Sequence, residues 1–586
     1  MPESAVKLLN SPYGVAAFGT FRRHNRAFVD KSGMIQDLDD DRMTPYPVLL
    51  RPRRFGKSTF LQMLKCFYDI SYADRYEELF AGTAIYSKHL PSHNTYHVVN
   101  FDFSGVSGDD KSTLIGSFVI ALKSGTTNFR MRYPDFVFEP SENAQKTPSG
   151  FIKSFFEAYA LYPARRSLYL MIDEYDNCAN SILSQDPGLF REIASAGGFL
   201  KDFYAAVKEA AADEDCVAKT FITGVSSISL DSLTSGFNIA LNVSADACFN
   251  TYAGFTESEL EKLIPELVDI KSLGVTVAEV IARMKPVYDG YCFSRGITQT
   301  VYNSSMCLYY LTKVQETGAF LDPADYMDPA SDHDGSKLQQ LFGIAEEDLA
   351  EIVTDTYLTG GTFPVKKLAE NINLNKSEKY DYVQLLSMLC HLGYLTIDPK
   401  QSDHSILYLK IPNLFMAKLF AQCTVALRLK PSSLFRDQPL DISSLVEVKD
   451  DISSFARSCT EFLSSIFTNH VLSQMSEMAL NLVLHAKLDT QFGVFAEMQK
   501  SLRVVGEGEK YADLVITVND GTENACIYLI ELKYTAKSNA TEGKIMSLRE
   551  KAAGQLEMYR KSLEFQGKQI KAYAMIFAGS ECVYCG

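Results

Sequence analysis

The sequence contains no tryptophan, no internal repeat and no long low-complexity segment. No stretch approaches the roughly 20 apolar residues that a membrane-spanning helix needs. The first residues, MPESAVKLLNSPYGVAAFG, lack the basic start and apolar run of a secretory signal peptide. We therefore expect a soluble intracellular protein with no membrane partner, located in the cytoplasm or, in a eukaryotic cell, the nucleus.

An excess of positive charge is also missing, because the net charge is −15. This balance argues against a protein that coats nucleic acid with its whole surface. Residues 533–571 are nevertheless locally basic, which is compatible with a basic groove or with an ordinary solvated helix face. The basic residues there are Lys533, Lys537, Lys544, Arg549, Lys551, Arg560, Lys561, Lys568 and Lys571. The acidic residues there are Glu542, Glu550, Glu557 and Glu564.

The twelve cysteines lack the spacing of a disulfide framework. Many lie in or beside apolar runs, where buried reduced thiols are the expected state inside a cell. Cys582 and Cys585 form one CxxC pair, but a structural zinc site needs two more ligands and none lies nearby. We therefore predict neither disulfides nor zinc.

A length of 586 residues favours about three domains at roughly 100–200 residues each. The predicted limits are 1–305, 306–445 and 446–586. In the first domain, apolar strand candidates alternate with helical stretches, which predicts a parallel sheet covered on both faces. The strand candidates are Val48–Leu50, Val98–Phe103, Leu168–Ile172 and Thr220–Thr223, and a helix is predicted over Thr59–Tyr68.

The middle region is predicted to be mostly helical. Its helix Tyr382–Leu392 is followed by strand candidates Tyr394–Ile397 and Ile406–Ile411 around a polar turn. A helix followed by a small hairpin is compatible with a winged-helix-like module.

Residues 436–450 are polar, and we interpret them as a linker into a C-terminal α/β domain. That domain opens with a long helical stretch, about Ile452–His485. Strand candidates follow at Gly493–Gln499, Ala512–Val518, Ala525–Leu532 and Lys571–Phe577, with a helix through about 544–564.

The first group of chemically informative residues is Arg51–Thr59, between a strand and a helix. Gly56 lets the backbone turn its N–H groups toward phosphate, and the helix N-terminus adds partial positive charge. Lys57 can reach the β- and γ-phosphates, and the Ser58 hydroxyl can bind Mg²⁺. Arg51 replaces the first glycine of a Walker A loop, so a chance Gly-Lys-Ser on a basic loop remains an alternative for this segment alone.

A second element makes nucleotide binding the better interpretation. The apolar run Leu168–Ile172 ends in Asp173 and Glu174, as in a Walker B strand. Asp173 would hold Mg²⁺ directly or through water, and Glu174 would polarise the attacking water. Found in this order after the Gly-Lys-Ser loop, the acidic pair predicts binding of ATP with Mg²⁺.

Further residues around this site have two interpretations each. Thr223 ends a strand where a γ-phosphate sensor would lie, but it could equally be an ordinary Thr capping the next turn. Arg53 and Arg54 could stabilise charge on a transferring phosphoryl group, or could fix the loop by pairing with Asp30 or Asp176. The candidate nucleotide-binding residues are Arg53, Arg54, Phe55, Gly56, Lys57, Ser58, Thr59, Asp173 and Thr223.

The second group of residues is near the C-terminus. Glu531 and Lys533 lie two apart on an apolar strand candidate and so share one face. Asp513 lies on the preceding strand, and a hairpin through 519–524 would bring the three side chains together. Two carboxylates can hold Mg²⁺, which polarises phosphate and activates water, while Lys533 can orient that water. Glu497 or Glu477 could complete the metal ligands.

A surface strand with a Glu–Lys ion pair would have the same short pattern. The apolar run Ile527–Ile530 makes this a core strand, where an unpaired Glu531 would be costly. The following helix brings Gln555 and Tyr559 one turn apart beside the basic stretch. The pattern therefore favours a metal-dependent phosphodiesterase site with Asp513, Glu531 and Lys533 as catalytic residues.

The two groups of residues resemble an AAA-ATPase-like family that carries a C-terminal PD-(D/E)xK nuclease domain. That family's loop reads RPRRFGKS, as at Arg51–Ser58, so the resemblance makes Arg51 the family's own form. Further matching segments, which extend the resemblance over most of 1–310, are Phe28–Ser32, Ile172–Asp176, Phe221–Ser226, Ser235–Asn238, Tyr288–Tyr291 and Val301–Asn303. The family is described as ATP-binding.

The resemblance continues in the last domain and implies a nuclease fold of the restriction-endonuclease type. Its matching residues are Glu477, Glu497, Gly508, Asp513, Leu514, Glu531, Leu532, Lys533, Gln555 and Tyr559. Two features depart from the family: Tyr511 stands where an Arg is frequent, and Gly506–Lys510 is more acidic than the usual G-x-G-R.

These observations predict an ATPase coupled to a Mg²⁺-dependent nuclease acting on DNA or RNA. One alternative is a non-cleaving switch that binds ATP tightly and only binds nucleic acid. Another is an ATPase that acts on a protein partner through residues 306–445. The sequence leaves self-association open.

Overall fold

The computed structural model describes residues 8–586 except 183–185, 195–197, 214–215, 229–232, 234, 321–331, 347, 371, 373–378, 404, 430–439, 442–451, 489–494, 505–507, 519–525, 563–564 and 566–567. The chain forms two compact units. The first comprises Met1–Phe320, Ile344–Glu346 and Pro364–Pro412, and the second comprises Leu321–Gly343, Glu347–Phe363 and Asn413–Gly586. The domain limits at 305 and 445 stay predictions.

The elements up to residue 320 alternate between strands and helices. They are α1 (Phe18–Arg23), α2 (Met34–Leu38), β1 (Pro47–Leu50), α3 (Lys57–Tyr68), α4 (Tyr76–Phe80), β2 (His97–Asp102), α5 (Lys111–Arg132), α6 (Pro148–Ala160), β3 (Leu168–Asp173), α7 (Asn177–Ile182), α8 (Pro187–Ala194), α9 (Phe199–Ala211), β4 (Val217–Gly224), β5 (Leu241–Asn242), α11 (Glu257–Leu267), α12 (Ile270–Leu273), α13 (Val277–Tyr288) and α14 (Ser304–Thr317).

The later elements are mostly helical up to residue 488 and then form a second sheet. They are α15 (Asp332–Gly343), α16 (Leu349–Leu358), β6 (Phe363–Val365), α17 (Tyr382–His391), β7 (Thr396–Ile397), β8 (Leu407–Lys410), α18 (Leu414–Arg428), α20 (Ile452–Ile466), α21 (Asn469–Gln474), α22 (Glu477–Leu488), β9 (Phe495–Val504), β10 (Gly508–Val518), β11 (Cys526–Thr535), α23 (Glu542–Tyr559), β12 (Ile570–Ala578) and β13 (Glu581–Cys585).

The first sheet is parallel throughout and has the order β2-β3-β4-β1-β5. β1 and β3 are buried at every position, and they read as nearly continuous apolar runs because helices cover both faces of the sheet. The predicted parallel sheet is therefore confirmed. Because parallel strands end at one edge, the loop after β1 and the acidic end of β3 lie on the same edge, with β4 between the two strands.

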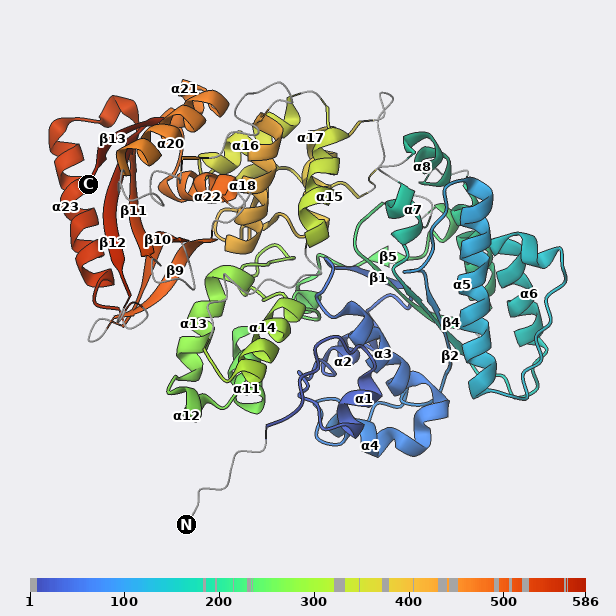
Figure 1. Ribbon diagram of the computed structural model, residues 1–586. Coiled ribbons are helices and arrows are strands. Elements are labelled where there is room, and N and C mark those ends of the chain that lie inside the picture. The colour runs from blue at the N-terminus through green and yellow to red at the C-terminus, as the bar shows by residue number, and fades with distance from the viewer. Residues whose placement is uncertain are drawn as a thin grey trace, which may run out of the picture. The chain divides into compact units, whose positions relative to one another are not determined.

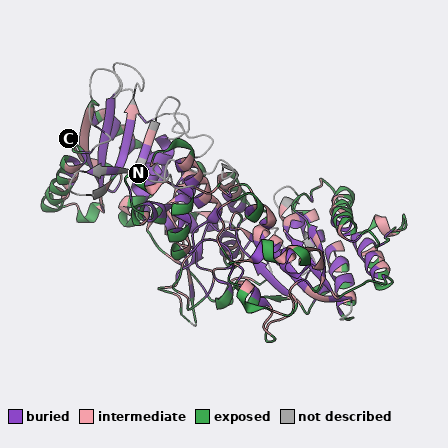
Figure 2. Cartoon of the chain, turned by 90° about the horizontal axis from the view of Figure 1, so that it is seen from below, coloured by how far each residue is buried: buried purple, intermediate pink, exposed green. Residues whose placement is uncertain are grey.

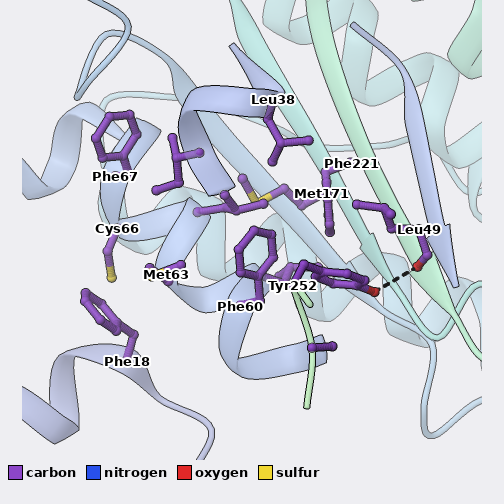
Figure 3. Close-up of a cluster of buried hydrophobic side chains, with 14 of the residues drawn as sticks. Phe18, Leu38, Leu49, Phe60, Met63, Cys66, Phe67, Met171, Phe221 and Tyr252 are labelled. Atoms are coloured by element: carbon purple, nitrogen blue, oxygen red, sulfur yellow. Dashed lines mark hydrogen bonds between the residues drawn. The ribbon is translucent and has the colours of Figure 1, made fainter. Parts of the chain in front are cut away.

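The two faces of this sheet bury different residues. Figure 1 shows α3 on one face and α5 and α6 on the other. On the α3 face, Phe60 packs with Met171, Phe221 and Tyr252 in the cluster drawn in Figure 3. On the opposite face, Gly125 of α5 lies so close to the Phe101 ring that a Cβ there would be 2.4 Å from it.

The middle region is helical, as predicted, and its helix–hairpin element is present. α17 begins at a capping box in which Asp381 and Gln384 satisfy each other's backbone N–H groups. β7 and β8 pair antiparallel, with Thr396 opposite Lys410. The winged-helix-like identity stays a prediction.

The C-terminal sheet is mixed, with the order β13-β12-β11-β10-β9. β11 and β12 pair in parallel, and the other neighbours are antiparallel. Figure 2 shows its central strands in the colour of buried residues, whereas the outward face of α23 is exposed. The sequence predicted the first four strands and the long helix, but it missed β13.

The helical stretch predicted over Ile452–His485 is broken into α20, α21 and α22. The break has local causes, because the Thr468 side chain caps α21 and the Ser476 hydroxyl caps α22 by accepting from Ala479 N–H. The predicted linker 436–450 lies outside the described residues apart from Leu440 and Asp441. In the described part of the chain, no helix combines the length and apolar character required to span a bilayer.

Candidate nucleotide site and C-terminal carboxylate cluster

The loop between β1 and α3 forms a turn that points the N-terminus of α3 into a cavity. Gly56 has a φ of 91° and Arg54 a φ of 69°, both left-handed, so the chain reverses just before the helix. Lys57 is the first residue of α3 and is almost fully buried. Its ammonium donates to the Pro52 carbonyl at 3.3 Å and lies 3.4 Å from a Glu174 carboxylate oxygen.

Arg51, which stands at the first glycine position of a Walker loop, points away from this turn. Its guanidinium is buried and donates to the carbonyls of Ser244 at 2.8 Å and Phe249 at 2.6 Å. The rings of Tyr252 and Phe293 lie 4.9 and 4.2 Å from its Cζ. Burial lowers the pKa of Arg51 to about 10, so the group stays charged at neutral pH. Arg51 therefore fixes the loop to the protein interior through the carbonyls of Ser244 and Phe249.

The acidic end of β3 faces this loop. The Ser58 hydroxyl donates a hydrogen bond to the Asp173 carboxylate, and burial raises the pKa of Asp173 to about 6. Glu174 follows with a φ of 51°, which is uncommon for a residue other than glycine. Ser58, Asp173, Glu174 and Lys57 are thus brought together, as the sequence predicted.

These groups line a cavity of about 680 Å³. One part of its lining is apolar and comes from the N-terminal segment and α14, including Val15, Ala16, Phe28, Val29 and Leu308. The other part is polar and adds Asn100, Asp102, Ser104 and Asn177 to the loop and the acidic pair. A nucleotide needs both parts, an apolar surface for its base and a polar one for its phosphates.

Arg53, Arg54, Phe55 and Thr59 also line the cavity, whereas Thr223 does not. The Thr223 hydroxyl donates to the Leu49 carbonyl at 2.7 Å within the sheet, so its role as a γ-phosphate sensor stays a prediction.

The carboxylates proposed as alternative partners of Arg53 and Arg54 accept backbone N–H groups. Asp30 accepts from Ser32 and Ala84 at 2.9 and 2.6 Å, and Asp176 accepts from Val225 and Ser226. Both acidic residues therefore fix the backbone of their own surroundings.

Lys31 lines the cavity but was not among the predicted site residues. Its ammonium donates to Glu259 at 2.7 Å and to the Thr251 carbonyl at 2.8 Å. The Phe28–Ser32 segment carried the only available signal for it. Ser304 and Ser305 were also missed, although they hold the loop through the Arg54 carbonyl, at 3.1 Å each.

The second group of predicted residues converges on Lys533 in the C-terminal sheet. The Lys533 ammonium lies 2.7 Å from Glu531, 3.2 Å from Glu477 and 3.7 Å from Asp513, measured to carboxylate oxygens. Asp513 also accepts from Leu532 N–H at 2.9 Å. Leu514 pairs with Ile530 in the antiparallel register of β10 and β11. One residue further along the same register, Asp513 lies opposite Glu531, so their side chains share one face of the sheet.

Glu531 is the most deeply buried acid of this cluster, at 1% exposure. Burial, followed by the charge of Asp513, raises the pKa of Glu531 to about 8. One of its carboxylate oxygens, Oε2, is buried and has no hydrogen-bond partner. Such an atom is costly unless a ligand or proton satisfies it.

The remaining predicted residues lie around this cluster. Glu477, at the start of α22, accepts from Tyr534 N–H at 3.2 Å, so the helix end brings it to the sheet. Glu497 on β9 pairs with Lys500. Gln555 donates to the Tyr559 hydroxyl at 3.2 Å, and that hydroxyl donates to the Tyr511 carbonyl at 2.8 Å.

No three or more His, Cys, Asp and Glu side chains among the described residues are arranged so that they could hold a metal ion as they stand. In the C-terminal cluster the Lys533 ammonium occupies the space between the carboxylates. The metal assignments of Ser58, Asp173, Glu497, Asp513 and Glu531 stay predictions.

The strand order, the loop before α3 and the acidic end of β3 define a Walker-type, P-loop ATPase domain. Residues 12–234 match the family model described as "Predicted AAA-ATPase", and this part of the chain is AAA-ATPase-like. Such domains in general bind ATP with Mg²⁺.

Two similar proteins provide further comparison. The chain is 29% identical over 264 residues to an uncharacterised protein in the vnfD 5′ region of Azotobacter chroococcum mcd 1, covering 44% of this chain and 45% of that protein. It thus spans less than half the length of that relative. The Walker-type ATPase PABY2304 of Pyrococcus abyssi aligns with a TM-score of 0.38 and 11% identity, over 67% of this chain and 94% of that one.

Proposed function

We propose that this chain hydrolyses ATP and that its C-terminal sheet is a restriction-endonuclease-like domain that cleaves DNA or RNA with Mg²⁺. The observation that carries the nuclease half is the convergence of Asp513, Glu531 and Lys533 on neighbouring strands. The alternating register of β10 and β11 fixes this arrangement in a buried sheet, where charged groups are rarely retained without a use.

In the ATP half, the amides before α3 and the ammonium of Lys57 bind phosphate oxygens. The hydroxyl of Ser58 and the carboxylate of Asp173 are the groups that would hold Mg²⁺, and their mutual hydrogen bond already brings them together. Glu174 orients and deprotonates water. Glu174 and Lys57 now pair with each other. When ATP binds, Lys57 would contact a phosphate instead, and Glu174 would contact the attacking water.

In the nuclease half, the chemistry of the donors fits a hard divalent cation. Glu531 Oε2 is a buried oxygen without a partner, and Asp513 lies across from it on the next strand. Asp513 and Glu531 would hold Mg²⁺, with Glu477 or Glu497 as a third ligand. The bound ion would polarise the phosphate and activate water. Lys533 would then stabilise the developing negative charge instead of spanning the carboxylates.

The test combines purified protein, Mg²⁺ and mixed DNA and RNA, with and without ATP. We expect cleavage by the wild-type chain and none by Asp513→Ala. Glu557→Gln is the matched control, because Glu557 is an exposed acid of the same unit whose contact is an i,i+4 pair with Lys561. Equal cleavage by wild type and Asp513→Ala would contradict the nuclease half and leave the ATPase half standing.

A second candidate is a non-cleaving ATP-dependent switch that only binds nucleic acid. The position of Lys533 within 4.0 Å of three carboxylates favours it, because an internal cation already neutralises the cluster. This candidate predicts tight ATP binding, negligible phosphate release that Glu174→Gln does not change, and retention of nucleic acid without cleavage.

A further inference from the structure

The turn that carries Glu174 is a strained part of the nucleotide site. Glu174 follows the last residue of β3 and adopts a φ of 51°, which its Cβ disfavours. Its N–H donates to the carboxylate of Asp173 at 3.0 Å. A residue held in this region needs surrounding contacts that fix the backbone on both sides.

The strands on both sides of β3 supply part of that support. Toward β4, Tyr175 N–H donates to the Thr223 carbonyl at 3.1 Å. Toward β2, the Asn177 side chain donates to the carbonyls of Phe103 and Ser104 at 3.1 and 3.0 Å. The turn is therefore tied to the strand ends on either side.

Asp176 lies in this turn and, like Tyr175, has no exposed surface. Its Oδ1 accepts from Val225 N–H at 3.0 Å, and its Oδ2 accepts from the N–H and hydroxyl of Ser226 at 2.8 and 2.7 Å. Asn180 Nδ2 donates to Oδ2 as well, at 2.6 Å. Four donors from two segments thus fix one carboxylate at the exit of β4.

Gly224 is required for this contact. A Cβ at Gly224 would lie 2.4 Å from Asp176 Oδ1 and 2.5 Å from the Tyr175 ring. Only a residue without a side chain lets the end of β4 approach the turn this closely. Tyr175 reinforces the same junction, because its hydroxyl donates to the Ser226 carbonyl at 2.6 Å.

The two acids of the turn also interact through their charges. The carboxylate of Glu174 raises the pKa of Asp176, after the larger effect of burial. Like charges repel, so a fixed carboxylate at Asp176 favours orientations of Glu174 away from it. The direction in which Glu174 extends is toward Lys57, at 3.4 Å, and into the cavity.

We propose that Asp176 is a positioning residue for ATP hydrolysis, which holds the backbone turn and the carboxylate of Glu174 in the orientation needed to activate water. The inference rests on the proposed ATPase function. Asp176 does not line the cavity, so it acts through Glu174 and through the exit of β4. Its role is orientation of the base, and nucleotide binding does not depend on it.

The test is a double-mutant cycle between Asp176→Asn and Glu174→Gln, with kcat and the Kd for ATP measured for each protein. An Asn side chain presents an amide to donors that need an acceptor, so the turn loses part of its hold. We expect kcat to fall by about 10- to 100-fold in the single Asp176→Asn variant, with an unchanged Kd, because misplacement by about 1 Å costs this much. In the Glu174→Gln background we expect less than about a twofold further fall.

Gly224→Ala disturbs the same contact from the opposite strand and should reproduce the loss of kcat with ATP binding retained. Asp69→Asn is the matched control. Asp69 is an equally buried acid of the same unit, paired with Arg132 at 3.0 Å, and it lies outside the cavity lining. This control should lower stability while leaving kcat unchanged.

The outcomes separate the inference from the proposed function. A wild-type chain that binds ATP without turnover contradicts both. Wild-type turnover with an unchanged kcat in Asp176→Asn overturns the inference alone. An equal fall of kcat in both backgrounds overturns it too, because Asp176 would then act independently of Glu174.

Discussion

At the scale of single residues, Arg51 explains how the loop works without the first Walker glycine. A glycine is usually needed there for close approach of the backbone to phosphate, but the Arg51 side chain turns into the protein and binds carbonyls. The motif Arg51–Ser58 could be predicted as a phosphate loop from the sequence. The burial of Arg51 could not, because it depends on rings contributed by Tyr252 and Phe293, some 200 residues later in the chain.

His97 gives a residue-scale prediction for pH. Burial lowers the pKa of His97 to about 4, and its Nδ1 lies 2.8 Å from the Tyr159 hydroxyl. The nearby charges are those of Asp69, Arg166 and Arg132. Because the folded pKa lies below the unfolded value of about 6.5, protonation favours the unfolded chain. His97 therefore contributes stability above pH 6.5 that is lost as pH falls toward 4.

The measurement is the free energy of unfolding in urea between pH 7 and pH 4, for wild type and His97→Gln. A fall of the His97 pKa from about 6.5 to about 4 sets an upper limit of about 3.4 kcal/mol for the loss. We expect the stability gap between the two proteins to narrow as pH falls, since Gln does not titrate. A gap that stays constant over this range would contradict the assignment.

At the scale of elements, the turn between α17 and β7 meets the phosphate loop. Gly393 has a φ of 85°, and a Cβ there would lie 3.0 Å from the Pro52 ring. Pro52 in turn offers its carbonyl to Lys57 at 3.3 Å. The helix–hairpin element therefore contacts the loop at Pro52, a residue that does not line the cavity.

Gly393→Ala should weaken ATP binding by about tenfold, since overpacking typically costs 1–3 kcal/mol. Gly274→Ala is the control, because Gly274 has a φ of 62° but nothing within 4 Å of an added Cβ. Both variants carry the strain of a left-handed alanine, and only the first displaces Pro52. Equal Kd values for ATP, measured by titration of both proteins, would show that the Pro52 contact does not matter.

Elements also show where prediction from sequence ends. Side chains two apart on β11 share one face, and the antiparallel register of β10 with β11 adds Asp513 to that face. Glu531, Lys533 and Asp513 therefore lie together, as expected. Glu477 was only one of two candidates for the additional metal ligand, because its position beside the sheet depends on where α22 begins. The breaks at Thr468 and Ser476 that start this helix arise from side-chain caps, a weak signal within an otherwise apolar-periodic stretch.

At the scale of the whole molecule, the chain consists of two compact units with separate cores. The cavity that carries the loop, Asp173 and Glu174 lies entirely in the first unit. The carboxylate cluster around Lys533 lies entirely in the second. A ligand stabilises the unit that binds it in the folded state, and it leaves an independently unfolding unit unchanged.

Thermal unfolding should therefore show two transitions that respond differently to nucleotide. ATP with Mg²⁺ at 100 times its Kd should stabilise the first unit by about 2.7 kcal/mol, whereas the transition of the second should not move. Lys57→Ala removes the ammonium that would bind phosphate and should abolish the shift. Calorimetry in the presence and absence of nucleotide distinguishes the cases. If ATP raises both transitions together, the two units do not unfold independently, and ATP binding in the first unit also stabilises the unit that carries the cluster around Lys533.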